Sequence, residues 1–275
     1  MNCTKAIIPV AGYGTRRLPI TKAVEKCMLP IGNRPIVDYV VEDCLKAGIT
    51  DIIFVVGEQF DQLQTYYGRN QLFEEYLRDN GKAKALEGVE QLAKKANFHY
   101  VVQDQHQPYG TAVPVALCNN MIEDDDVALV VMGDDFIYNR DGSSELARLI
   151  KGVEEAGTTA GMLAVEVPHK DVHLYGVLRT DNGDFVDVIE KPSIEDAPSN
   201  LINISKYLFD KTMFNLAETI ADDDGIAGER QVTDVLNRYV ANGKRMVVVP
   251  VKGEYLDGGT THGWLHANNV ILGAS

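Results

Sequence analysis

Short apolar runs that alternate with helical segments are the feature that most restricts the fold of this 275-residue chain. The runs at 6–11 and 51–56 have the length of buried strands, and helical spacing extends between them from about residue 35 to Gly48. Strands in this arrangement are joined by right-handed β-α-β crossovers. The alternation continues with a strand at 99–103, a helix at 111–122 and a strand at 126–135. We therefore predict an α/β fold with a mostly parallel central sheet flanked by helices.

The spacing of the apolar runs changes in the second half of the chain. Between about 158 and 210 the apolar runs lie closer together, which predicts antiparallel or mixed additions to the same sheet. The polar segment 71–97 has a helical pattern and is expected to be a surface excursion. No Pro/Ser-rich linker or repeat interrupts the sequence, so we predict a single domain over 1–275. The remaining expected elements are helices near 144–156, 211–220 and 230–242, a strand at 245–251 and a helix from about 261.

The charge balance restricts the partners. The chain has 40 acidic and 26 basic side chains and a net charge of −14, so it repels nucleic-acid backbones and anionic membranes. A small anionic ligand stays compatible only if basic residues gather locally. The four cysteines show no C-x-x-C spacing, which indicates reduced thiols. With no signal-peptide pattern and no long apolar run, we expect a cytoplasmic protein.

A glycine-rich turn follows the first strand. Gly12 and Gly14 let the backbone turn tightly and bring N–H groups close to a phosphate. A dinucleotide fingerprint would need a third glycine where Arg17 stands, which argues against a dinucleotide-dependent oxidoreductase. A lone G-x-G also occurs for steric reasons, and nearby lysines can simply be solvated. The candidate anion-binding residues are Ala11, Gly12, Gly14, Thr15, Arg16 and Lys26.

The segment GYGTRRLPITKAVEKCMLP (12–30) resembles the N-terminal signature of the sugar-1-phosphate nucleotidylyltransferases. Its continuation to residue 49 is similar to bacterial UTP–glucose-1-phosphate uridylyltransferases, which typically read T-K-A-I-P-K-E-M-L-P. Here Glu25 replaces the usual proline and Cys27 the usual glutamate. The resemblance extends from about residue 4 to 268. It implies a Rossmann-like nucleotidyltransferase fold, with a nucleotide-binding half at about 4–140 and a sugar-binding half at about 141–268.

The resemblance also implies roles on the nucleotide side, where Arg16 and Lys26 would hold the triphosphate. In QHQPYGTA (105–112), Gln105 would read the pyrimidine edge and Gly110 would let the base approach the backbone. An amide side chain suits this task because it supplies a donor and an acceptor together. Gln103 is a nearby competitor for the role.

A possible metal site comes from acidic residues at strand ends. Asp134 follows an apolar strand, and ligands of open α/β sheets bind at the carboxyl ends of strands. Carboxylates suit Mg²⁺, which is usually held by one or two of them plus substrate phosphates. The resemblance assigns the metal to Asp134 and offers Asp257, in YLDGGTTHGW, as second ligand. Asp135 is interpreted as a strand-end cap.

The sugar side is predicted from Tyr175-Gly176-Val177 and from the E-K-P at 190–192. The resemblance implies that Glu190 accepts hydrogen bonds from sugar hydroxyls and that Lys191 holds the sugar phosphate. Gly176 would allow close backbone approach to the sugar. Further along, Ser205 and Lys206 replace a Gly-Arg pair of the family.

These assignments imply an enzyme that uses Mg²⁺ to join UTP and glucose 1-phosphate into UDP-glucose and pyrophosphate. The partners would be these small molecules and further copies of the chain, as a dimer or tetramer. Alternatives are a nucleotidylyltransferase specific for dTTP or another sugar 1-phosphate, and a non-catalytic regulatory homologue. The basic residues expected to face the phosphates are Arg16, Arg17, Lys22, Lys26 and Lys191.

Overall fold

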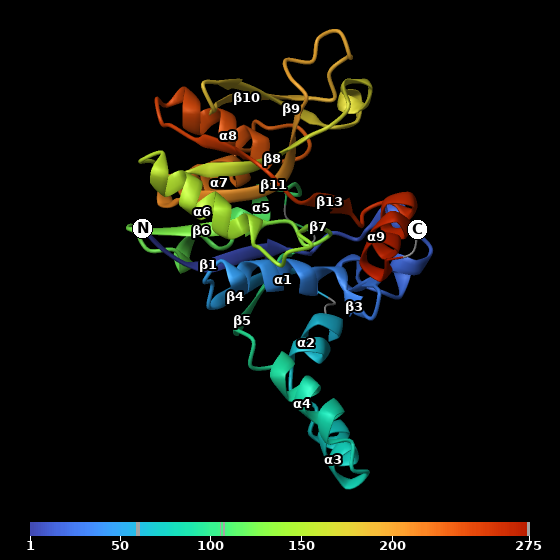
Figure 1. Cartoon of the computed structure of the whole chain (residues 1–275). Coiled ribbons are helices and arrows are strands. Elements are labelled where there is room, and N and C mark those ends of the chain that lie inside the picture. The colour runs from blue at the N-terminus through green and yellow to red at the C-terminus, as the bar shows by residue number, and fades with distance from the viewer. Residues whose placement is uncertain (59–60, 105, 107, 274–275) are drawn as a thin grey trace.

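The computed structural model describes residues 1–58, 61–104, 106 and 108–273. Among these residues, nine strands form one sheet in the order β5-β4-β1-β6-β11-β8-β12-β10-β9, with helices on both faces (Figure 1). The predicted α/β class is confirmed. The strands are β1 (Asn2–Pro9), β2 (Pro30–Ile31), β3 (Arg34–Pro35), β4 (Asp51–Val56), β5 (Asn97–Val102), β6 (Asp126–Val131), β7 (Asp135–Tyr138), β8 (Gly161–Glu166), β9 (Gly176–Asp181), β10 (Asp184–Glu190), β11 (Leu201–Asp210), β12 (Val247–Pro250) and β13 (Glu254–Asp257).

The N-terminal strands build the parallel part of the sheet. β1 lies between β4 and β6 and pairs parallel with both, and β4 pairs parallel with β5. Successive residues of β1 point to opposite faces, so Ile7 packs in one core cluster and Ala6 and Ile8 in the other. This burial on both faces explains why the strand is continuously apolar.

The C-terminal half adds the antiparallel and mixed strands that the spacing of 158–210 predicted. β11 pairs antiparallel with both β6 and β8, and β10 pairs antiparallel with β9. β12 returns parallel to β8. One sheet therefore runs through both the predicted nucleotide half and the predicted sugar half, while the boundary between them at about 140 stays a prediction.

Two predicted elements are wrong in their extent. The strand expected over 126–135 ends at Val131, and β7 starts only at Asp135, in a separate ladder with β13. Gly133 lies in the break, where a Cβ would come within 2.6 Å of Val10 Cγ1. The helix expected over 111–122 is instead a short α-helix at 113–116 and a separate 3₁₀ turn at 119–121.

Helices cover both faces of the sheet. Val37 and Leu149, from α1 and α6, pack on the side of Ile8, whereas Phe214 and Leu236, from α7 and α8, pack on the side of Ile7. The helices are α1 (Ile36–Lys46), α2 (Asp61–Tyr67), α3 (Gln71–Asp79), α4 (Ala83–Leu92), α5 (Val113–Ala116), α6 (Glu145–Glu155), α7 (Lys211–Ala221), α8 (Val232–Ala241) and α9 (Thr261–Leu272), with 3₁₀ turns η1 (Thr15–Arg17), η2 (Ile20–Lys22), η3 (Lys26–Met28), η4 (Asn119–Met121) and η5 (His169–Leu174).

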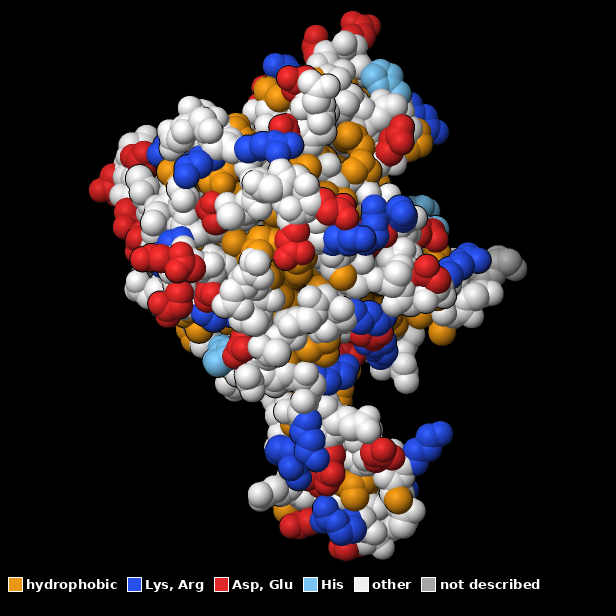
Figure 2. Space-filling model, turned by 60° about the vertical axis from the view of Figure 1, so that its left-hand side comes forward, with side chains coloured by type: hydrophobic (Ala, Val, Ile, Leu, Met, Phe, Trp, Pro, Cys, Tyr) orange, Lys and Arg blue, Asp and Glu red, His pale blue; other side chains and the backbone are white. Residues whose placement is uncertain are grey.

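The polar excursion predicted at 71–97 contains α3 and α4, which together with the preceding α2 form an arm that projects from the body (Figures 1 and 2). Its base is anchored on Asp38, which is 1% exposed. Lys95 Nζ lies 2.8 Å from Asp38 Oδ1, and the Tyr67 hydroxyl donates to the same oxygen at 3.1 Å. In the described part of the chain, none of the helices has the length and apolar character needed to cross a membrane.

Candidate active site

The glycine-rich turn after β1 is folded around the stem of Lys26. Gly14 has a left-handed φ of 63°, and a Cβ on it would lie 3.0 Å from Lys26 Cβ, so only glycine fits without strain. The Thr21 hydroxyl donates to the Gly14 carbonyl at 2.9 Å and fixes the turn. The loop therefore sets the direction in which the Lys26 side chain leaves the backbone.

Arg17 does not face the phosphates, contrary to the prediction. It is 7% exposed, and its Nη1 donates to the Thr260 carbonyl at 2.6 Å. Its guanidinium also lies 5.4 Å from the centre of the Trp264 ring. Arg17 thus ties the loop to the start of α9, whereas its neighbour Arg16 stays exposed. Two adjacent arginines look equivalent in sequence, and only packing separates them.

Three predicted residues meet around Gly259, in the loop between β13 and α9. A Cβ on Gly259 would lie 2.9 Å from Asp257 Oδ1, 3.3 Å from Asp134 Oδ2 and 3.5 Å from Arg16 Nη2. Because glycine has no side chain, two carboxylates and a guanidinium face one small space. The Gly258 N–H donates to the Asp134 carbonyl at 3.0 Å and the Gly259 N–H to Asp257 Oδ1 at 2.7 Å, so both aspartates are held from the same loop.

Lys26 joins this cluster through an ion pair with Asp134. Burial raises the pKa of the Asp134 carboxyl, but the positive charges of Lys26, Lys206 and Arg16 outweigh it and hold the pKa below its usual value. Asp134 is therefore ionised at neutral pH. An ionised carboxylate beside a second one is a donor set that suits Mg²⁺ together with substrate phosphates. No group of three or more metal-binding side chains occurs within the described residues.

Asp135 is not a strand-end cap, and the interpretation from sequence was wrong. It is buried in β7, where it forms an ion pair with Lys206 of β11 and accepts a hydrogen bond of 2.9 Å from the Tyr255 hydroxyl of β13. Burial raises the pKa of Asp135 to about 6, against the opposing charge of Lys206. This network was missed because its three residues come from three distant segments.

The substitutions at 205–206 are explained by the same region. Ser205 has a φ of 52°, a left-handed conformation that favours the glycine of the family. Lys206 has the same positive charge as the family's arginine and forms an ion pair with Asp135. Ser205 and Lys206 therefore provide a left-handed backbone position and a buried positive charge in this chain.

The sugar-side residues lie together at one end of β9 and β10. Gly176 and Glu190 are register partners, and a Cβ on Gly176 would come within 3.0 Å of Glu190 Oε1. In this structure the space beside Gly176 is thus taken by the Glu190 carboxylate. Lys191 has a φ of 46°, and its N–H donates to the Tyr175 carbonyl at 2.9 Å. The side chains of Glu190 and Lys191 are exposed.

Electrostatics connects the sugar side to the acidic cluster. Burial raises the pKa of Tyr175, and the negative charges of Asp257 and Asp171 raise it further. Burial likewise raises the pKa of Tyr207 to about 12, with Glu190 and Asp135 adding to the rise.

The predicted pyrimidine-reading segment is only partly described. Gln105 lies outside the described residues. Gly110 has a φ of 130°, and a Cβ on it would meet the Arg230 backbone at 2.3 Å, so its glycine is needed for packing against the chain itself. The competitor Gln103 donates its backbone N–H to the Val56 carbonyl at 2.8 Å.

This arrangement of two carboxylates, basic side chains and a glycine-rich loop at the end of a parallel sheet is that of a nucleotide-processing enzyme. The family model described as nucleotidyl transferase matches residues 5–273, and the chain belongs to that family.

Within the family, the chain is similar to a UTP–glucose-1-phosphate uridylyltransferase of Pseudomonas aeruginosa, with 34% identity over 96% of this chain and 94% of the relative. A UTP-bound UGPase from Acinetobacter baumannii superimposes with a TM-score of 0.88 at 27% identity, covering 98% of this chain and 93% of the other. A UDP-glucose pyrophosphorylase complexed with UDP-glucose has a TM-score of 0.84 at 30% identity, over the full length of both chains.

Proposed function

We propose that the protein transfers the uridylyl group of UTP to glucose 1-phosphate, giving UDP-glucose and pyrophosphate. The observation that carries this proposal is the convergence of Arg16, Asp134 and Asp257 on the open face of Gly259, with Lys26 paired to Asp134. The similarity to uridylyltransferases and to UTP- and UDP-glucose-bound structures supports the substrate pair.

The reaction needs positioning and charge neutralisation more than acid–base chemistry. A phosphate oxygen of glucose 1-phosphate bonds to the α-phosphorus of UTP, and the bond from that phosphorus to the bridging oxygen of the β-phosphate breaks. The attacking oxygen is already anionic, so no proton has to be removed. Arg16 and Lys26 hold the triphosphate, with the loop residues Ala11, Gly12, Gly14 and Thr15 around it. Lys191 holds the sugar phosphate.

We further propose that Asp134 and Asp257 hold Mg²⁺. The bare Cα of Gly259 leaves space beside the two carboxylates. The Gly259 N–H orients the Asp257 carboxylate, the Gly258 N–H holds the backbone of Asp134, and Lys26 pairs with the Asp134 carboxylate. When bound, the ion supplies positive charge against the phosphates. Glu190 accepts hydrogen bonds from the sugar hydroxyls, beside Gly176, and Gln105 and Gly110 are assigned to the pyrimidine.

Pyrophosphate release from a panel of nucleoside triphosphates and sugar 1-phosphates, with and without Mg²⁺, tests the function. UTP with glucose 1-phosphate should give the highest kcat/KM, and only with the metal. A higher kcat/KM with dTTP or with another sugar 1-phosphate would identify that pair as the substrates instead. Release with no pair at all would favour a non-catalytic homologue and contradict the proposal.

The remaining proposals concern the state of the protein in the cell. We propose a cytoplasmic homo-oligomer, a dimer or tetramer, with no nucleic-acid or membrane partner. The net charge of −14 supports the exclusion of anionic polymers and surfaces. Light scattering after size-exclusion chromatography measures the oligomeric state, and a monomer would contradict this part.

A further inference from the structure

Glu25 stands directly before Lys26, where the resembled uridylyltransferases have proline. Its φ is −55°, inside the range that a proline ring imposes. Its carbonyl accepts a 2.8 Å hydrogen bond from the Met28 N–H and so opens the turn η3 that carries Lys26. The backbone shape therefore suits proline, but glutamate does not enforce it covalently.

Three hydrogen bonds to Gln62 hold this backbone instead. The Glu25 N–H donates to Gln62 Oε1 at 3.0 Å, and the Gln62 N–H donates to Glu25 Oε1 at 3.0 Å. The Gln62 Nε2 donates to the Ala23 carbonyl at 2.8 Å. Proline has no N–H and no side-chain acceptor, so the first two bonds depend on Glu25 itself.

Gln62 is a firm anchor for the loop. It lies in the first turn of α2, whose Leu63 and Tyr67 are buried in the body. The Tyr67 hydroxyl in turn donates to the buried Asp38. The bonds from Gln62 thus connect the Lys26 loop to a packed part of the arm and not to its exposed tip.

We propose that Glu25 and Gln62 form a clamp that positions Lys26 for the triphosphate, replacing by hydrogen bonds the restraint that proline gives covalently. The two are positioning residues that act through Lys26. The inference rests on the assignment of Lys26 to the triphosphate. The physical reason is that a loop already fixed in its bound shape loses less conformational freedom when the substrate binds.

A double-mutant cycle tests the clamp. Gln62→Leu removes the amide and should lower kcat/KM for UTP about tenfold, with KM for glucose 1-phosphate changed less than about twofold. Glu25→Pro should stay within about threefold of the parent because proline restores the restraint. In that background Gln62→Leu should cost less than about threefold, so the two changes are coupled.

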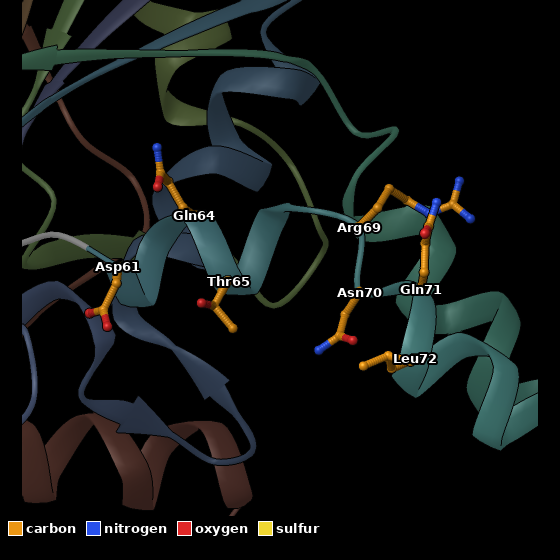
Figure 3. A pocket seen from close by; sticks show the side chains of 7 residues that line it. All are labelled: Asp61, Gln64, Thr65, Arg69, Asn70, Gln71 and Leu72. Atoms are coloured by element: carbon orange, nitrogen blue, oxygen red, sulfur yellow. The ribbon is translucent and has the colours of Figure 1, made fainter.

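Calorimetric titration with UTP alone gives a readout that does not depend on turnover. Gln62→Leu should weaken UTP binding, and Glu25→Gln, which keeps the N–H and the accepting oxygen, should preserve it. Gln64→Leu is the matched control. Gln64 is an exposed glutamine of the same helix, and it lines the hollow between α2 and α3 (Figure 3), so its replacement should leave UTP binding unchanged.

The outcomes separate the clamp from the site it serves. Additive effects in the cycle, or equal losses toward both substrates, would overturn the clamp even if Lys26→Ala is inactive. Full activity of Lys26→Ala would overturn both the clamp and the assignment of Lys26. Melting temperatures of all variants are measured alongside, and if Gln62→Leu does not fold, Gln62→Ala takes its place in the cycle.

Discussion

The nucleotide side and the sugar side of the site hold their charged groups differently. On the nucleotide side, Lys26 is paired with Asp134, whose carbonyl is bonded to Gly258. On the sugar side, Glu190 and Lys191 are exposed at the end of β10, and Lys191 is held through its backbone N–H. Lys26 is thus held by an ion pair before substrate arrives, whereas Glu190 and Lys191 are exposed to solvent.

This difference has an energetic consequence. A side chain that is already restrained loses little rotamer entropy on binding, whereas an exposed lysine loses much of it. We expect substitutions on the nucleotide side to impair UTP binding and kcat, and those on the sugar side to weaken chiefly the binding of glucose 1-phosphate.

Asp134→Asn should have the largest effect. It removes the charge that pairs with Lys26 and that would bind the metal, so we expect kcat to fall on the order of 10³-fold. Steady-state pyrophosphate release measures this. Asp124→Asn, in an exposed acidic run, is the control and should be neutral. A loss of less than tenfold in kcat would contradict the expected importance of the nucleotide side.

Lys206→Met tests whether the buried ion pair between Lys206 and Asp135 stabilises the nucleotide side of the site. It leaves the buried Asp135 carboxylate without its ion-pair partner, which should cost about 3 kcal/mol in the free energy of unfolding. Urea denaturation measures the loss. Lys206→Arg keeps the charge and should retain most of the stability. If both variants were as stable as the parent, the ion pair would not be what holds β7 against β11.

Lys191→Ala should reduce kcat/KM for glucose 1-phosphate by roughly 10²-fold, through loss of the phosphate contact. UTP affinity, measured by calorimetry, should not change. Lys170→Ala removes another exposed lysine and serves as the control. Loss of UTP binding in Lys191→Ala would show that the two sides are not separate.

The smallest effect concerns pH. Burial raises the pKa of Glu25 above its ordinary value of 4.5, and the charge of Asp61 adds to it. The folded state then binds this proton more tightly than the unfolded state, so the stability from Glu25 falls as pH rises above 4.5. Unfolding free energies measured from pH 4 to 7 should fall less steeply in Glu25→Gln than in the parent. An identical slope would contradict the shifted pKa.

The sequence predicted most of the fold because apolar periodicity reports which residues are buried. The strand-helix alternation and the mixed second half are both confirmed. What it could not show is pairing between distant segments. Asp134 and Asp135 are adjacent and chemically identical, yet one faces Gly259 and the other Lys206. Likewise, Arg16 and Arg17 differ in their surroundings only because Trp264 and Thr260 pack against Arg17.

The β7–β13 ladder has a consequence for how the protein becomes active. It joins Asp135 to Asp257, and the hydrogen bond from Tyr255 to Asp135 spans 120 residues of sequence. Closing so long a loop costs conformational entropy, which the contacts made across it must offset. The carboxylates of Asp134 and Asp257, which meet at Gly259, therefore come together only when distant parts of the chain have docked. Substrate that binds there stabilises the whole fold, and a partly folded chain offers it no complete site.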